Sequence, residues 1–182
     1  ASEKTGHLDR TQMRDAVDAA IDWASSSAGE AALLMASIDG LGAINDAYGL
    51  DVADEVIAET TRRLSEALGP EGGALGRVGG NKVAILLLDC ARGAIGEYAG
   101  RLRNAVQESL IPTSGGAIAA TVSLGALSLP SGAATSEVAL MRAEDALSES
   151  KRFGRSNLSI YDASPEREAS RRRKAALGTE II

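Results

Sequence analysis

Two glycines, Gly79 and Gly80, stand between two apolar runs of the chain and are followed directly by Asn81 and Lys82. Glycine has no side chain, so a pair of glycines lets the backbone come close to a bound phosphate group. The same pair is also typical of a tight turn between two strands, which is the more common role. These residues therefore suggest phosphate binding at a turn, with a plain hairpin as the alternative.

The composition removes several other kinds of chemistry. Cys90 is the only cysteine and His7 the only histidine, so the chain has no disulfide framework and no usual set of zinc ligands. With 19 Lys and Arg against 25 Asp and Glu, the net charge is −6, which argues against nucleic acid as a partner. No apolar run reaches the roughly 20 residues that span a bilayer, and no signal peptide opens the chain. We expect a cytoplasmic domain without direct membrane contact.

Regular elements must position these residues, and the apolar pattern predicts where they lie. Apolar residues recur at three- and four-residue steps in five segments, which predicts helices over residues 8–26, 40–48, 52–68, 94–110 and 137–151. Shorter apolar runs predict strands over residues 31–38, 74–78, 82–88, 118–129 and 157–161. Because a hairpin occurs together with crossover helices, the order predicts an α/β (α+β) domain with a mixed central sheet flanked by helices.

Three details of the sequence concern packing. The chain is 45% apolar but only 3% aromatic, so we expect an aliphatic core. Gly125, inside the longest predicted strand, indicates either a bulge or a close approach by another element. In the last predicted helix, we expect Met141 to face the core.

Six segments, taken in order, resemble the motifs of one family. They are TGHLDR (5–10), SIDGLGAIND (37–46), YGLDVADEV (48–56), RVGGNKVAILL (77–87), TVSLGA (121–126) and RAEDALSESKRFGRSNLSIYD (142–162). Together they are similar to a GGDEF domain, the domain of diguanylate cyclases. The resemblance implies a palm-like fold related to nucleotidyl cyclases and polymerase palms. We expect a degenerate GGDEF domain over residues 1–162 and a basic helical linker over residues 163–182.

The positions that match the family's metal site have lost their carboxylates. An active member condenses two GTP molecules into cyclic diguanylate, and Mg²⁺ carries the charge that develops on the phosphate. Mg²⁺ prefers anionic oxygen ligands, but its two ligand positions hold Ser37 and Asn81, and the neighbouring acidic position holds Lys82. Gly42 replaces the family's phosphate-contacting lysine. We therefore expect no catalytic residues, no Mg²⁺ bound in the usual way and no cyclase activity.

Other positions keep the residues with which the family binds its nucleotide. Asn45 and Asp54 match the guanine-reading positions, where an amide can serve a base edge and a carboxylate can accept from N1–H and the 2-amino group. Lys151 and Arg155 match a phosphate-binding basic pair. Each assignment has an alternative as an ordinary helix-end residue. We expect the domain to require no cofactor and to have GTP as its ligand. The expected nucleotide-binding residues are Asn45, Asp54, Gly79, Gly80, Lys82, Lys151 and Arg155.

Three further expectations come from the resemblance. The family's product-inhibition motif, Arg-x-x-Asp, is replaced by PEGG at residues 70–73, so we expect no cyclic diguanylate to bind there. The tail over residues 163–182 resembles the linker that joins a GGDEF domain to an EAL phosphodiesterase domain. Asp39 and Arg77 match positions with structural roles.

Three functions remain open on these grounds. The first is a catalytically inactive regulatory domain that binds GTP as an allosteric ligand, with Lys82 standing in for the missing cation, and acts on an adjacent EAL domain in the same chain. The second is a scaffold or dimerisation module without a nucleotide, and a homodimer is an expected partner in either case. The third is an active cyclase with unusual metal ligands.

Overall fold

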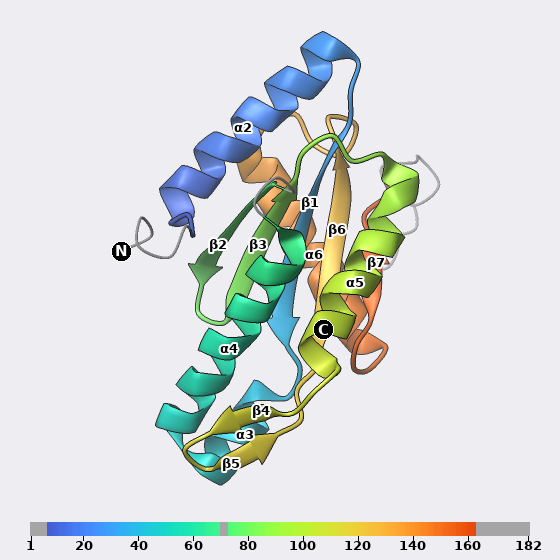
Figure 1. Ribbon diagram of the computed structural model, residues 1–182. Helices are drawn as coiled ribbons and strands as arrows, with labels where there is room; N and C mark the ends of the chain where they lie inside the picture. The colour runs from blue at the N-terminus through green and yellow to red at the C-terminus, as the bar shows by residue number, and fades with distance from the viewer. Residues whose placement is uncertain (1–6, 70–72, 163–182) are drawn as a thin grey trace, which may run out of the picture.

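A five-stranded mixed sheet forms the centre of the molecule (Figure 1). The computed structural model describes residues 7–69 and 73–162. The elements in chain order are α2 (Arg10–Ser27), β1 (Ala31–Ile38), α3 (Leu41–Tyr48), α4 (Leu50–Leu68), β2 (Gly73–Gly79), β3 (Lys82–Leu87), η1 (Arg92–Ala94), α5 (Ile95–Gln107), β4 (Ile111–Thr113), β5 (Gly116–Ile118), β6 (Val122–Leu129), α6 (Ser136–Arg152) and β7 (Leu158–Ile160). The main sheet has the order β2-β3-β1-β6-β7, in which only the β6–β7 pair is parallel. The mixed α+β architecture expected from the sequence is confirmed.

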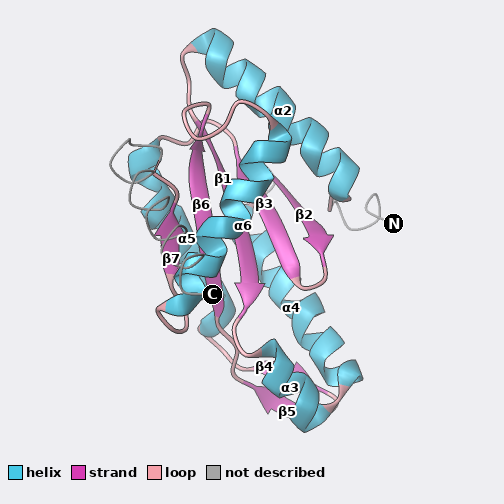
Figure 2. Cartoon of the chain, turned by 180° about the vertical axis from the view of Figure 1, so that it is seen from behind, coloured by secondary structure: helices cyan, strands magenta, loops and turns pink. Residues whose placement is uncertain are grey.

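Helices cover both faces of the sheet. The helices α4 and α5 lie on one face, and α2 and α6 lie on the other (Figure 1 and Figure 2). The central strand β1 is buried at every position, because its alternate side chains enter different cores. Leu34 packs with Val56 of α4 in one core, while Leu33 packs with Val17 of α2 in the other. Both cores are mainly aliphatic, as the composition predicts.

The first helix shows how local sequence signals set an element's limits. Asp9 caps α2 by accepting a hydrogen bond from the Gln12 N–H at 2.8 Å, and the Gln12 side chain accepts from the Asp9 N–H at 2.9 Å. This reciprocal pair satisfies backbone donors that the helix leaves open. Just before α2, Leu8 pairs with β2 through a bridge to Gly76.

Among the described residues, no helix is both long and apolar enough to cross a membrane.

One predicted strand is wrong. The continuous apolar run over residues 118–129 is divided between two sheets, since Ile118 pairs with Ile111 in the β4–β5 hairpin and β6 begins only at Val122. The hairpin is attached to α4, because Ser114 donates from its hydroxyl group to the Glu55 carboxylate at 2.7 Å. Apolar content alone does not reveal where a run changes its pairing partner.

The inward orientation expected for Met141 is also wrong, because its side chain is 52% exposed. The face of α6 that contacts the sheet consists largely of small residues, among them Ala139, Ala143 and Ala146. These small residues let α6 lie unusually close to β6. A Cβ atom at Gly125 would lie 2.1 Å from the Leu147 nitrogen, and the β1–β6 register runs through Gly125 without a shift. Of the two alternatives for Gly125, the close approach is therefore correct.

We predict that Gly125→Ala lowers the free energy of unfolding by about 3 kcal/mol, because the added methyl group must push the α6 backbone away from β6. Urea denaturation of both proteins measures the difference. The matched control is Gly100→Ala in α5, where a Cβ atom would meet nothing within 4 Å. This control should stabilise the protein by about 0.5–1 kcal/mol, because it removes a glycine from a helix interior. Equal stability of Gly125→Ala and the wild type would contradict the close packing.

Candidate functional site

The carboxyl end of β1 and the β2–β3 turn meet at the same end of the sheet. Ser37 of β1 lies directly opposite Lys82 of β3, and both Ser37 and Asn81 line a small internal void. The turn consists of Gly80 and Asn81, with Gly80 at a φ of +50°. Arg77 closes this turn by donating to the Gly80 carbonyl oxygen at 2.7 Å. The sequence-predicted hairpin is confirmed, and its exposed glycines leave room for another group to approach.

Lys82, which follows this turn, has a charged partner on α6. Its ammonium group forms an ion pair with Glu144 of α6, with 3.1 Å between Nζ and Oε1. The two side chains are 41% and 40% exposed, so the pair contributes little to stability. A position that holds an acidic residue in the family's pattern therefore holds a positive charge that is neutralised within the chain.

Asp39, which follows β1, is a buried carboxylate with four donors. One oxygen accepts hydrogen bonds from the Ser123 hydroxyl at 2.7 Å and from Lys151 Nζ at 3.4 Å. The other oxygen accepts from the Thr121 hydroxyl at 2.7 Å and from the Ser156 N–H at 2.9 Å. The side chain is only 5% exposed. Asp39 thus joins β1 to the start of β6 and to the segment after α6, which agrees with the structural role expected for it.

The surroundings of Asp39 set its protonation state. Burial by itself opposes ionisation, but the hydrogen bonds from Ser156, Thr121 and Ser123 and the charge of Lys151 outweigh it. As a result, the pKa of Asp39 lies below its ordinary value of 3.8. The carboxylate is ionised at neutral pH and is committed to its four donors.

Lys151 and Arg155 gather over the carboxyl end of β1. The Lys151 ammonium lies 3.4 Å from the Ile38 carbonyl oxygen, and its side chain is 35% exposed. The Arg155 guanidinium lies beside Gly40, where an added Cβ atom would be 3.1 Å from Nη2. The structure therefore places this basic pair next to residues 38–40, which follow Ser37 in the chain. Lys151 also stands in the last turn of α6, so the helix-end alternative applies to it as well.

Asn45 and Asp54 lie on the two helices that follow β1. Asn45 is in the last turn of α3 and Asp54 in the first part of α4, and both are exposed. Neither side chain forms a hydrogen bond with another described residue, so both are accessible to a ligand. The seven predicted residues thus fall into two groups: Asn45 and Asp54 on the α3–α4 pair, and the remainder around the end of β1.

Four residues that organise this region were not predicted from the sequence: Glu144, Ser156, Arg103 and Gln107. Glu144 pairs with Lys82, and Ser156 donates its N–H to Asp39. Arg103 and Gln107, both on α5, bind Ser156. No local pattern marks these residues, because each has an ordinary type for its helix or loop and acquires its role only through a distant partner.

The oxygen atoms at this end of the sheet do not suit Mg²⁺ as metal ligands. Ser37 and Asn81 offer neutral oxygens, whereas Mg²⁺ prefers carboxylates in octahedral array. The two carboxylates of the region, Asp39 and Glu144, are bound to donors of the chain itself. Within residues 7–69 and 73–162, no group of three His, Cys, Asp or Glu side chains is placed to hold a metal ion.

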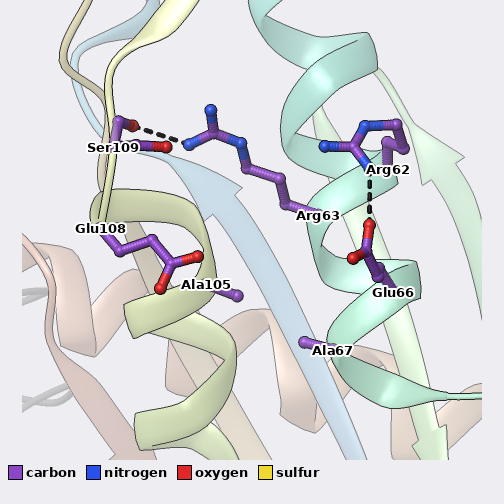
Figure 3. A pocket seen from close by; sticks show the side chains of 7 residues that line it. All are labelled: Arg62, Arg63, Glu66, Ala67, Ala105, Glu108 and Ser109. Atoms are coloured by element: carbon purple, nitrogen blue, oxygen red, sulfur yellow. Dashed lines mark hydrogen bonds and ion pairs between the residues drawn. The ribbon is translucent and has the colours of Figure 1, made fainter.

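A separate open cleft of about 330 Å³ lies between α4 and α5, away from these residues (Figure 3). Its lining includes Arg63, whose guanidinium donates to three carbonyl oxygens at the end of α5, those of Val106, Ser109 and Leu110. Hydrogen bonds from Arg62 and Arg63 lower the pKa of Glu59 to about 2. Arg63 thus joins α4 to the end of α5, whereas Arg62 forms ion pairs with Glu59 and Glu66 of its own helix.

Some expectations lie outside the described residues. The product-inhibition motif is covered only at residue 73, the linker over residues 163–182 not at all, and the TGHLDR segment only from residue 7. They remain predictions from the sequence.

Comparisons with known proteins agree with the fold. The model of the family described as diguanylate cyclase, GGDEF domain, matches residues 3–157. YhcK from Bacillus subtilis is 30% identical over 128 residues, which are 70% of this chain and 35% of that protein. Diguanylate cyclase A from Treponema denticola is 29% identical over 128 residues, which are 70% of this chain and 34% of that protein. The chain thus spans about a third of the length of these relatives.

A solved structure is similar over nearly its whole length. The crystal structure of the GGDEF domain of YfiN from Pseudomonas aeruginosa superimposes with a TM-score of 0.81 and 25% sequence identity. The similarity covers 88% of this chain and 99% of that chain.

We predict that Asp39→Asn lowers the free energy of unfolding at neutral pH by about 2 kcal/mol, because its donors lose a charged acceptor. A carboxyl group whose folded pKa is lowered stabilises the protein above its ordinary value of 3.8, and this contribution is lost as the pH falls through the lowered folded value. The loss of stability in acid should therefore be smaller in Asp39→Asn than in the wild type. Urea denaturation at a series of pH values measures both effects.

The matched control for this prediction is Asp46→Asn, which changes an exposed carboxyl group on α3. Its stability and its acid dependence should follow those of the wild type. If the two variants behave alike, Asp39 does not hold the region together.

Proposed function

Because the chain belongs to the GGDEF family of diguanylate cyclase domains, we propose that it is a regulatory domain of cyclic diguanylate signalling that binds GTP without converting it. One observation carries this proposal. The positions for the metal hold Ser37, Asn81 and Lys82, whereas the positions for the base hold Asn45 and Asp54 with free, exposed side chains. The domain thus combines a changed catalytic end with a retained base-binding end.

The donor chemistry supports the absence of catalysis. Attack of a ribose hydroxyl on the α-phosphorus places negative charge on phosphate oxygens, and the family's carboxylates hold the cation that offsets it. Here the corresponding region offers a hydroxyl, an amide and an ammonium group. The ammonium of Lys82 is paired with Glu144 and has no lone pair to offer a divalent cation. Lys82 can offset phosphate charge, but it cannot polarise an attacking hydroxyl as a metal ion does.

The retained residues support binding of a guanine nucleotide. The Asn45 amide and the Asp54 carboxylate provide a donor, an acceptor and an anionic acceptor, which complement the edge of guanine. At the other end, Lys151 and Arg155 supply positive charge over the carboxyl end of β1. The exposed turn at Gly79 and Gly80 lets a triphosphate approach the backbone there.

A specific observation also favours the second function, a scaffold without a nucleotide. Lys151 is paired with Asp39, and Lys82 is paired with Glu144. A triphosphate must compete with these carboxylates for both ammonium groups, which weakens its binding. The affinity for GTP therefore distinguishes a nucleotide-sensing domain from a scaffold.

We further propose that the regulated partner is an adjacent EAL phosphodiesterase domain in the same chain. The relatives are about three times as long as the matched region, which is compatible with additional domains. In the longer protein, Asn45→Ala and Asp54→Ala should change the response of the phosphodiesterase activity to GTP. An unchanged response would contradict nucleotide sensing.

We predict that the isolated chain binds GTP below millimolar concentration and that omitting Mg²⁺ changes the affinity less than threefold, since no carboxylate pair holds the ion. Asp54→Ala should weaken binding about tenfold, because a lost charged hydrogen bond is worth about 1.4 kcal/mol. Isothermal titration calorimetry measures both. Asp51→Ala, which removes another exposed carboxylate from the first turn of α4, is the matched control and should leave the affinity unchanged. No binding at millimolar GTP would rule out the nucleotide site.

We also predict that the purified chain, incubated with GTP and Mg²⁺, forms no cyclic diguanylate, because its metal positions lack carboxylates. Chromatography of the reaction, with an active diguanylate cyclase run in parallel, provides the measurement. Product that disappears in Asn81→Ala would instead establish an active cyclase with unusual ligands.

A further inference from the structure

Ser156, the residue directly after Arg155, has all of its polar groups engaged by other elements. Its N–H donates to Asp39 at 2.9 Å, and its carbonyl oxygen accepts from Arg103 Nη1 at 2.6 Å. Its hydroxyl donates to the Gln107 side-chain oxygen at 3.0 Å. One residue of the loop between α6 and β7 is therefore held from two directions, by the end of β1 and by α5.

The backbone of Ser156 is in an unfavourable conformation. Its φ is +54°, a left-handed value that residues other than glycine rarely adopt. Such a conformation persists only when surrounding interactions determine it, and such residues cluster at binding sites. The three hydrogen bonds of Ser156 supply that determination.

Arg103, which donates to the Ser156 carbonyl oxygen, has an unfavourable feature of its own. Its Nε–H is buried and has no hydrogen-bond partner among the described residues. A buried donor without a partner is unfavourable. The hydrogen bond from Nη1 to the Ser156 carbonyl oxygen helps to offset this cost and keeps the side chain in place. Two unfavourable features thus meet at a single contact, the one between α5 and the loop that carries Arg155.

We propose that Arg103 and Gln107 are positioning residues for the phosphate half of the nucleotide site. They act through Ser156, which fixes the backbone beside Arg155 and supplies one of the donors to Asp39, the carboxylate that holds Lys151. The helix α5 then contributes to binding of the triphosphate without touching it. This inference rests on the proposed binding of GTP.

The test compares two ligands by isothermal titration calorimetry, because guanosine carries the base and lacks the phosphates. Arg103→Met keeps an unbranched apolar stem but removes the guanidinium group that donates to Ser156. It should weaken GTP binding about tenfold and leave guanosine binding unchanged. Gln107→Met, at an exposed position that tolerates substitution, removes only the acceptor of the Ser156 hydroxyl and should weaken GTP binding about threefold.

The matched control is Arg101→Met. Arg101 stands on the same helix and carries the same charge, but its guanidinium lies 4.4 Å above the centre of the Tyr98 ring. This variant should bind both ligands as the wild type does, so a loss specific to Arg103→Met cannot come from net charge.

Three results would overturn the inference. If Arg103→Met and Gln107→Met bind GTP as tightly as Arg101→Met does, α5 does not position the phosphate site. If Arg103→Met weakens guanosine and GTP equally, Arg103 supports the fold in general. If the wild type binds neither ligand, the proposed function itself fails. This result is distinguishable from the first two because it is seen in the wild type alone, without any variant.

Discussion

The buried carboxylate of Asp39 is the interaction on which the functional end of this molecule depends. It stands where β1 ends, and its donors come from β6, from α6 and from the loop that precedes β7. An ionised carboxylate can be buried only when its hydrogen-bonding capacity is filled, so these segments must meet at one point. Through this constraint, the end of a central strand determines where Lys151 and Arg155 lie.

The packing of the fold and the polar groups at this end of the sheet are supplied by different residues. The fold superimposes on the GGDEF domain of YfiN with a TM-score of 0.81, and Ser37, Asn81 and Lys82 place hydroxyl, amide and ammonium groups at the end of β1 and around the β2–β3 turn. None of these three residues belongs to the two aliphatic cores, whose buried side chains pack the helices against the sheet. The residues that pack the two cores are thus distinct from the polar residues on which the proposed function depends.

The helix α5 has a wider role than packing against the sheet. At its carboxyl end it receives hydrogen bonds from Arg63 of α4, and along its length it binds Ser156 through Arg103 and Gln107. It thereby links the helix that carries Asp54 to the loop that carries Arg155. The two halves of the proposed nucleotide site are connected through this helix as well as through β1.

The sequence by itself determined the order of the helices and main strands, the turn at Gly80 and Asn81, the aliphatic cores and the presence of a hydroxyl, an amide and an ammonium group at Ser37, Asn81 and Lys82. These features depend on local patterns and residue types, which a chain displays before it folds. Only the tertiary structure decided that residues 118–129 divide between two sheets, that Met141 faces outward, and that Lys82 and Lys151 are paired with Glu144 and Asp39. It also decided between a bulge and a close approach at Gly125. Each of these depends on contacts between segments far apart in the chain, whose geometry no local pattern encodes.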